Sequence, residues 1–97
     1  MLHTVNKSPF KTNNLESCIR FIDKDDVILL FEDGVYAAAA NTSQSSLIEN
    51  IIKSNKVYAL QADLKARGID DLIKGVELAD YDKFVDLVEA APVNAWL

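Results

Sequence analysis

The run VILLF, Val27 to Phe31, leaves few folds open to this chain. It is continuously apolar and follows the polar segment DKDD, whereas a strand with one face in water alternates apolar and polar residues. A continuous run of this kind is typical of a central parallel strand that is covered by helices on both faces. The turn sequence Glu32–Gly34 predicts the end of the strand.

The apolar residues on either side of this run switch between strand-like and helix-like spacing. Further strands are predicted at Leu2–Val5, Lys56–Leu60 and Val76–Leu78. Strands that alternate with helices are joined by crossovers, which give a mainly parallel sheet. Because 97 residues support one core, the predicted fold is a single domain over residues 1–97. We expect an α/β protein, a small three-layer α/β/α sandwich of four or five strands like the flavodoxin and Rossmann folds, with the strand order left open.

Two helices are predicted from capping boxes, in which a polar residue and a glutamate stand three residues apart. Asn13 with Glu16 marks the start of one helix, and Ser46 with Glu49 marks the start of another. A further helical piece is expected at Val35–Ala40. The buried stripes expected for the two capped helices are Leu15, Cys18, Ile19 and Ile22, and Leu47, Ile48, Ile51 and Ile52.

Two more helices are predicted in the second half of the chain. Gly68 is expected to end a short helix, because glycine readily adopts the left-handed conformation of helix ends. Asp80 is expected to cap the last helix, which Pro92 separates from a short C-terminal tail. Four residues of this last helix are predicted to share one buried face: Tyr81, Phe84, Val85 and Val88.

Composition excludes several classes of function. The net charge is -5 and no basic run offsets it, so direct binding of nucleic acid is disfavoured. No apolar segment approaches the roughly 20 residues that span a bilayer, and no secretory signal is evident, so we expect a cytoplasmic protein without membrane contacts. With one cysteine and one histidine in the chain, we expect no structural metal.

No familiar catalytic set follows the predicted strands. The three glycines are scattered, so there is no phosphate-binding loop, and we expect no cofactor. The acidic pairs beside the central strand raise the alternative of a receiver-like phosphoacceptor site. However, Asp25 and Asp26 precede the strand while Glu32 and Asp33 follow it, so the pairs lie at opposite ends and are expected to be solvated turn residues.

Cys18 has two roles open to it. On the apolar stripe of its helix a thiol is buried, has a raised pKa and is unreactive. Its position about one turn beyond the helix start, near Arg20, instead favours a thiolate. His3 could act as its base, although a histidine in a strand is more often a satisfied core residue.

Six collinear segments, spread over essentially the entire chain, resemble the DsrH/TusB family of sulfur-relay subunits. The resemblance implies one subunit of a heterohexamer, two copies of each of three chains, with DsrE/TusD-like and DsrF/TusC-like partners. It implies that the main sulfur-accepting cysteine belongs to the DsrE/TusD-like partner, so that this chain is not itself an enzyme. Persulfide sulfur would pass to a DsrC/TusE-like carrier, for 2-thiolation of the tRNA wobble uridine or for dissimilatory sulfur oxidation. The segments are LHTVNKSPF, LESC, LLFEDGVYAA, DLKARG, DYDKFVDL and NAWL.

The resemblance also assigns roles to individual residues. Cys18 in LESC matches a cysteine of the DsrH branch that TusB proteins can lack, which favours sulfur oxidation and makes Cys18 an accessory persulfide site, with packing as the alternative. The alternatives for the whole chain are a purely structural subunit with an inert cysteine and an independent flavodoxin-like ligand-binding domain. We expect the folded chain to expose an apolar patch that partner chains cover. The candidate interface residues are Asp33, Gly34, Val35, Tyr36 and Trp96; a strand-to-helix turn that needs the backbone freedom of Gly34, and core packing of Trp96, are the alternatives.

Overall fold

The computed structural model describes residues 1–97 and forms one five-stranded sheet with the strand order β4-β3-β2-β1-β5. The strands are β1 (Leu2–Val5), β2 (Val27–Leu30), β3 (Val57–Leu60), β4 (Glu77–Ala79) and β5 (Val93–Trp96). All neighbouring strands are parallel, and β2 occupies the centre as its continuous apolar run predicted. The predicted α/β fold with a mainly parallel sheet is confirmed.

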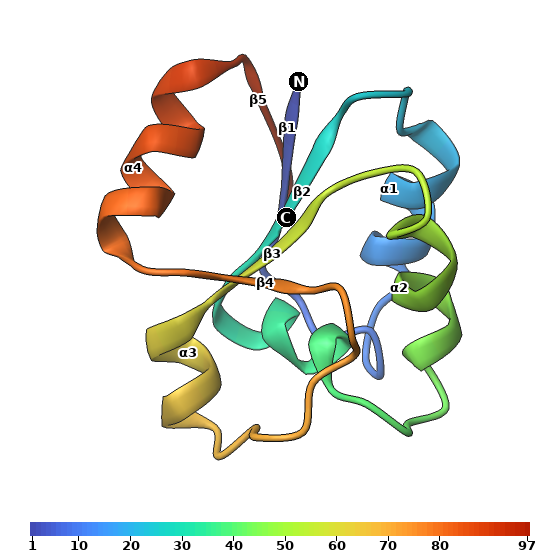
Figure 1. Ribbon diagram of the computed structural model, residues 1–97. Coiled ribbons are helices and arrows are strands. Elements are labelled where there is room, and N and C mark those ends of the chain that lie inside the picture. The colour runs from blue at the N-terminus through green and yellow to red at the C-terminus, as the bar shows by residue number, and fades with distance from the viewer.

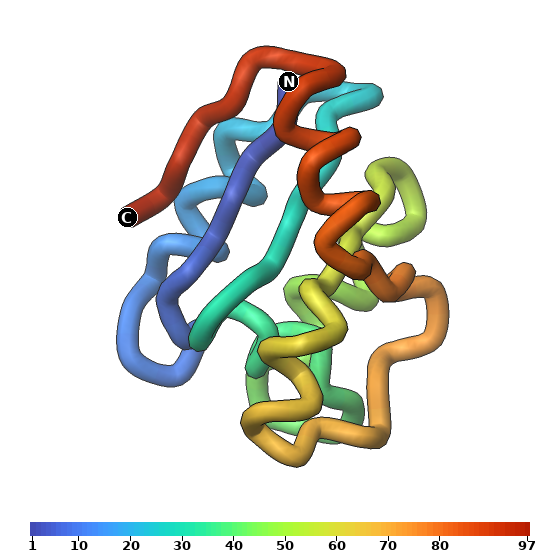
Figure 2. Tube along the Cα trace, turned by 90° about the vertical axis from the view of Figure 1, so that its left-hand side faces the viewer, coloured from blue at the N-terminus to red at the C-terminus, as the bar shows by residue number.

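The helices cover the two faces of the sheet unequally (Figure 1). One face lies against α1 (Asn14–Phe21), the 3₁₀ helix η1 (Glu32–Ala38) and α2 (Ser45–Ile51), and we call it the α1/α2 face. α3 (Gln61–Ala66) continues from the carboxyl end of β3. The opposite face carries only α4 (Tyr81–Ala90), which crosses in front of the sheet in Figure 2, and we call it the α4 face.

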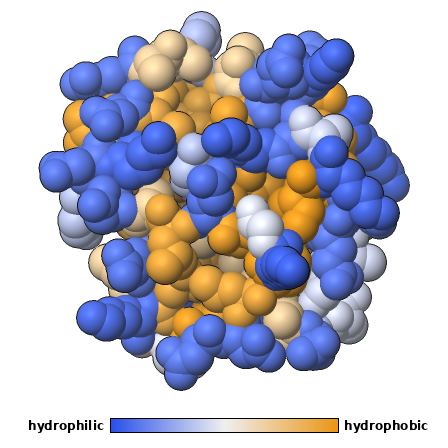
Figure 3. Space-filling view, in the orientation of Figure 1, coloured by the Kyte–Doolittle hydropathy of each residue, from blue (hydrophilic) through white to orange (hydrophobic).

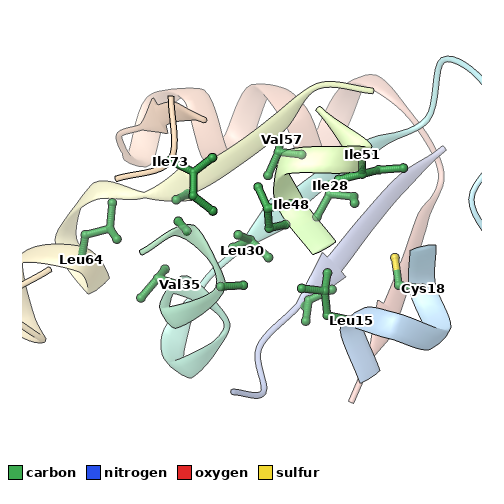
Figure 4. Close-up of a cluster of buried hydrophobic side chains, with 14 residues drawn as sticks. Leu15, Cys18, Ile28, Leu30, Val35, Ile48, Ile51, Val57, Leu64 and Ile73 are labelled. Carbon is green, nitrogen blue, oxygen red and sulfur yellow. The ribbon is translucent and has the colours of Figure 1, made fainter. Parts of the chain in front are cut away.

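The main core lies between the sheet and the helices of the α1/α2 face (Figure 4). Side chains alternate along each strand, so Ile28 and Leu30 of β2 point to this face while Leu29 points to the other. α1 contributes Leu15 and Cys18, which are fully buried. Fourteen buried residues form this core: Val5, Leu15, Cys18, Ile28, Leu30, Val35, Ala37, Ala38, Ile48, Ile51, Val57, Ala59, Leu64 and Ile73.

The core on the α4 face is much smaller. It consists of Leu2, Leu29, Tyr58 and Ala79, all contributed by the sheet. α4 adds Phe84 and Leu87, but these side chains are only partly buried, and no residue of α4 is fully buried. The predicted buried face of α4 is therefore wrong in most of its members. Tyr81, Val85 and Val88 are 68%, 49% and 38% exposed, because they lie on the side of the helix next to the one that meets the sheet.

The C-terminal residues form β5, which corrects the predicted tail. Val93–Trp96 pairs in parallel with β1, and the backbone N–H of Leu2 donates to the carbonyl oxygen of Pro92 at 2.8 Å. The segment VNAW is short and mixed in polarity, and its side chains are at most half-buried at the edge of the sheet. Periodicity alone therefore could not identify it as a strand.

The two predicted capping boxes are wrong, although both helices exist. Asn13 directly precedes α1 but its side chain accepts no capping hydrogen bond, and Ser46 lies inside α2. Ser45 ties the start of α2 to the preceding loop instead, because its hydroxyl accepts from the Thr42 N–H at 2.8 Å and donates to the Ala39 carbonyl at 3.1 Å.

The signals at the ends of α3 and α4 are confirmed. Gly68 follows α3 with a φ of 65°, the left-handed conformation expected of a residue that ends a helix. Asp80 caps α4, and its carboxylate accepts the Lys83 N–H at 2.8 Å.

Candidate functional site

Cys18 lies on α1 with its sulfur directed into the main core (Figure 4). Its exposed fraction is 0%, and burial, followed by the negative charge of Asp26, raises the pKa of the thiol to about 12. Arg20 does not offset this effect, because its guanidinium is exposed and pairs with Glu16 one turn away at 2.8 Å. The neutral thiol is therefore the stable form in the folded chain, and it is inaccessible to a nucleophilic partner.

His3 is a fully buried histidine whose ring nitrogens both have partners. Trp96 Nε1 donates to His3 Nδ1 at 3.1 Å, so the ring proton lies on Nε2, which is 2.9 Å from Asp26 Oδ2. The Met1 amino group also contacts Asp26, at 3.0 Å. His3 is thus fixed between β2 and β5 and has no free nitrogen to act as a base for Cys18.

Asp26 is the charged centre of this network. The hydrogen bond to His3, followed by that from the backbone of Asp23 and helped by the Met1 amino group, lowers the pKa of its carboxyl to about 2. The three aromatic rings of His3, Phe21 and Trp96 pack nearby, with ring centroids 5.8 to 6.2 Å apart. The network joins the N-terminus, α1 and β5, so its role in the isolated chain is to hold the edge of the sheet together.

The segment EDGVY turns from the end of β2 into η1. Gly34 has no room for a side chain, since a Cβ there would lie 2.0 Å from the Val5 carbonyl oxygen, and Val35 is fully buried in the main core. Tyr36 is half-buried, whereas Glu32 and Asp33 are exposed, and Asp33 pairs at 3.0 Å with Arg67, which directly follows α3. Of the five candidate interface residues, Gly34 and Val35 thus lie inside the chain, while Asp33, Tyr36 and Trp96 reach the surface.

Glu32, at the start of this turn, adopts a φ of 48° that is unusual for a residue with a side chain. Its backbone N–H donates to Asp63 Oδ2 at 2.7 Å, and Arg67 Nη1 lies 3.6 Å from the other Asp63 oxygen. The Glu32 carboxylate accepts from Asn6 Nδ2 at 3.3 Å and that of Asp33 pairs with Arg67, so both are engaged far from Asp26 at the other end of the strand. No group of three metal-ligating side chains exists anywhere in the chain.

A hollow of about 280 Å³ opens at the carboxyl ends of β3 and β4. The chain leaves β3 into α3 and leaves β4 into α4 on the opposite face, and ligands of open α/β sheets bind at such a reversal. Here, however, the hollow contains no cysteine or histidine, and its one carboxylate, that of Asp80, caps α4. The lining residues are Leu60, Gln61, Ala62, Lys65, Asp80 and Tyr81.

The surface around β4 is apolar. Figure 3 shows an apolar hollow, bordered by hydrophilic residues, in the area framed by α3, β4 and the segment between them. Its apolar lining includes Ile69, Leu72 and Leu78, of which Leu78 is 50% exposed. No helix in the chain is long and apolar enough to cross a membrane.

Sequence reasoning missed two features of the structure. The His3–Trp96 contact joins residues 93 positions apart, and only the unrecognised strand β5 brings them together. The exposed side of α4 was the second, because Tyr81, Val85 and Val88 have the spacing of a buried stripe although Phe84 and Leu87 are the residues that pack on the sheet.

Solved structures share this fold along nearly the full chain. The ychN protein of E. coli superposes with a TM-score of 0.84 at 18% identity, over 97% of each chain. A protein of unknown function from Methanobacterium thermoautotrophicum superposes with a TM-score of 0.72 at 14% identity, over 97% of this chain and 96% of the other. At these identities the likeness establishes the fold and nothing further.

Sequence comparison identifies the family. A family model described as DsrH like protein matches residues 7–93. Protein TusB of Pectobacterium parmentieri is 36% identical over 99 residues, which cover 99% of this chain and 100% of that protein. Protein TusB of Escherichia coli strain K12 is 38% identical over 98 residues, again 99% of this chain and 100% of the relative. The chain therefore belongs to the DsrH/TusB family of sulfur-relay proteins.

Proposed function

We propose that this chain is a non-catalytic subunit of a cytoplasmic sulfur-relay complex. Its partners in this proposal are a DsrE/TusD-like and a DsrF/TusC-like chain, assembled with it as a heterohexamer, and the sulfur leaves to a DsrC/TusE-like carrier. The observation that supports it most strongly is the match to TusB proteins over the whole length of the chain. A small parallel sheet with no catalytic cluster suits a subunit that completes an assembly.

The main acceptor cysteine in this proposal belongs to the DsrE/TusD-like partner. A persulfide forms when a thiolate attacks a sulfur donor, which requires an accessible and ionised thiol. Cys18 is neither, because it is fully buried and its pKa is raised to about 12. We therefore assign Cys18 a packing role and not an accessory persulfide site.

The branch of the pathway that we favour is 2-thiolation of the tRNA wobble uridine. The relatives compared above are TusB proteins, and the cysteine of LESC, which favoured sulfur oxidation, has a sufficient explanation in core packing. With a net charge of -5, the chain would act in this pathway through its protein partners and without touching tRNA itself.

Co-expression with the two proposed partner chains tests the assembly. Native mass spectrometry should detect a complex with equal numbers of the three chains. Incubation of this complex with a cysteine desulfurase and cysteine should add about 32 Da, one sulfur atom, to a cysteine peptide of the DsrE/TusD-like chain. The peptide that contains Cys18 should stay unmodified. A persulfide on Cys18 in the intact complex, or the absence of any mixed complex, would contradict the proposal.

Complementation separates the two branches. In a strain that lacks this gene, wild-type protein and Cys18→Ala should both restore 2-thiouridine in tRNA. The matched control is Ala substitution of the acceptor cysteine on the partner, which should abolish thiolation although the complex still assembles. Unchanged tRNA thiolation in the deletion strain would assign the chain to another sulfur pathway.

A further inference from the structure

α4 has two apolar sides, and the sheet uses only one of them. Phe84 and Leu87 point toward the sheet, where the Phe84 ring meets that of Phe31 at a centroid distance of 6.2 Å. The second side is formed by Tyr81, Val85 and Val88, at positions i, i+4 and i+7. We call these three residues the outer stripe.

The outer stripe is accompanied by a row of acidic residues. Asp82, Asp86 and Glu89 repeat the same spacing one residue further along, so they form a parallel row on the solvent side of the stripe. All three are exposed, and none takes part in an ion pair within the chain. The nearby Lys83 lies on the other side of the helix, 5.3 Å from the centre of the Tyr58 ring, so it does not neutralise the row.

The apolar surface continues onto the sheet. Val93 of β5 pairs with Leu2 and therefore lies on the α4 face, and its side chain is 43% exposed. In Figure 2, β5 forms the left-hand edge of the sheet, and α4 lies in front of the sheet to the right of β5.

We propose that the outer stripe and its acidic row form a docking surface for a partner protein that presents an apolar groove bordered by lysine or arginine side chains. Valine and tyrosine side chains would be desolvated in the groove, while the basic border would face Asp82, Asp86 and Glu89. Complementary charges of this kind fix the orientation of a partner and accelerate its association. This surface lies apart from Asp33, Tyr36 and Trp96, and the inference does not depend on the sulfur-relay role.

The acidic row also selects against other occupants. A second copy that paired antiparallel through α4 would place like flank against like flank, so two acidic rows would face each other, and like charges oppose such contact. Nucleic acids and anionic lipid surfaces carry phosphates that the row repels. A basic-bordered protein surface satisfies both the stripe and the row.

Site-specific photocrosslinking in living cells tests this proposal. The full chain is expressed with benzoylphenylalanine in place of Val85, and a control version carries it in place of the exposed Asn50 on α2. We expect irradiation to yield an adduct with a different protein from position 85 alone. The crosslinked peptide of that protein should contain apolar residues with neighbouring lysine or arginine in its folded surface.

Charge reversal supplies the decisive comparison. Asp86→Lys with Glu89→Lys should reduce the adduct by at least about tenfold, because like charges across an interface are strongly unfavourable. Glu49→Lys, an equivalent change on the exposed side of α2, should leave it unchanged. Circular dichroism and thermal unfolding establish that each variant is folded.

Three results would overturn the proposal: an adduct between two copies of this chain, no adduct above the position-50 background, or an adduct that survives charge reversal at Asp86 and Glu89. An adduct with a protein outside any sulfur-relay assembly would support the docking surface and count against the proposed function. An intact relay complex that assembles without contacts or crosslinks at the outer stripe would support the proposed function and count against the docking surface.

Discussion

The α1/α2 face and the α4 face use the same sheet in different ways. On the α1/α2 face, three helical segments bury side chains such as Leu15, Val35 and Ile48 completely. On the α4 face, one helix of ten residues buries none, and its best-packed residues, Phe84 and Leu87, remain partly exposed. Three further apolar residues of that helix, Tyr81, Val85 and Val88, are exposed on the adjacent side of the helix.

This difference in burial indicates that the α1/α2 face stabilises the fold, whereas the α4 face is available for contact with another protein. Complete burial of an aliphatic side chain contributes roughly 1.5 to 3 kcal/mol, so the fourteen-residue core accounts for most of the hydrophobic stabilisation of the chain. The α4 face contributes less to folding and exposes more apolar surface. Exposed apolar surface does not stabilise a monomer, whereas a subunit of an assembly can bury it against a partner.

Matched truncations on the two faces should show the largest difference. Ile48→Ala on α2 removes a fully buried side chain and should lower the free energy of unfolding by about 3 to 4 kcal/mol. Leu87→Ala on α4 removes a partly buried one and should cost about 1 to 2 kcal/mol. Urea denaturation of both variants measures the two values. Equal losses would show that the α4 face is packed as firmly as the other.

Cys18 tests whether the α1/α2 face tolerates a polar group. Cys18→Ser should destabilise the chain by about 2 kcal/mol, because the hydroxyl has no partner among the apolar residues of the core. Cys18→Ala is the control, because it removes volume without adding polarity and should cost less. In the wild-type protein, iodoacetamide should modify the thiol only after denaturant is added. Rapid labelling of the native chain would show that α1 detaches from the core and exposes the thiol, and it would favour the accessory persulfide role of Cys18.

Most of the α1/α2 face could be predicted from the sequence. VILLF identified the central strand, and the stripes through Leu15 and Ile48 identified the helices that cover it, since long apolar patterns reflect burial directly. The predicted capping boxes of those helices were wrong. At α2 the hydroxyl of Ser45 is bonded to the preceding loop, and the conformation of that loop depends on the tertiary structure.

The α4 face and the candidate site were less predictable. Tyr81, Val85 and Val88 have the same spacing as a buried stripe, and a sequence does not say which of two apolar sides meets the sheet. The register of β5 brings Trp96 to His3, and a contact between the two ends of the chain leaves no local pattern. Membership of the family, by contrast, followed from segments spread along the chain, and sequence comparison confirmed it.

The network around Asp26 should make the α1/α2 face sensitive to acid. The folded-state pKa of Asp26 is lowered from 3.8 to about 2, so its contribution to stability is fully present above about pH 4 and is lost as the pH falls toward 2. The contribution is about 1 kcal/mol, since the carboxylate is partly solvated.

Asp26→Asn removes this contribution and should flatten the stability profile between about pH 4 and pH 2, as followed by urea denaturation at each pH. Asp25→Asn is a suitable control, because the adjacent exposed carboxylate has no hydrogen-bond partner in the network. Parallel profiles for wild type and Asp26→Asn would refute the assignment.

The smallest effect on stability is expected at the outer stripe of α4. Val85→Ser with Val88→Ser replaces exposed side chains that contact no core, so the free energy of unfolding of the isolated chain should change by less than about 1 kcal/mol. The same double variant should strongly reduce binding to a partner, because it removes the apolar centre of the docking surface while the acidic row stays intact. Urea denaturation of the isolated chain and photocrosslinking from position 81 in place of Tyr81 measure the two effects on one protein. A loss of stability comparable to that of Ile48→Ala would mean that the stripe packs within the chain, and the contrast between the two faces would then disappear.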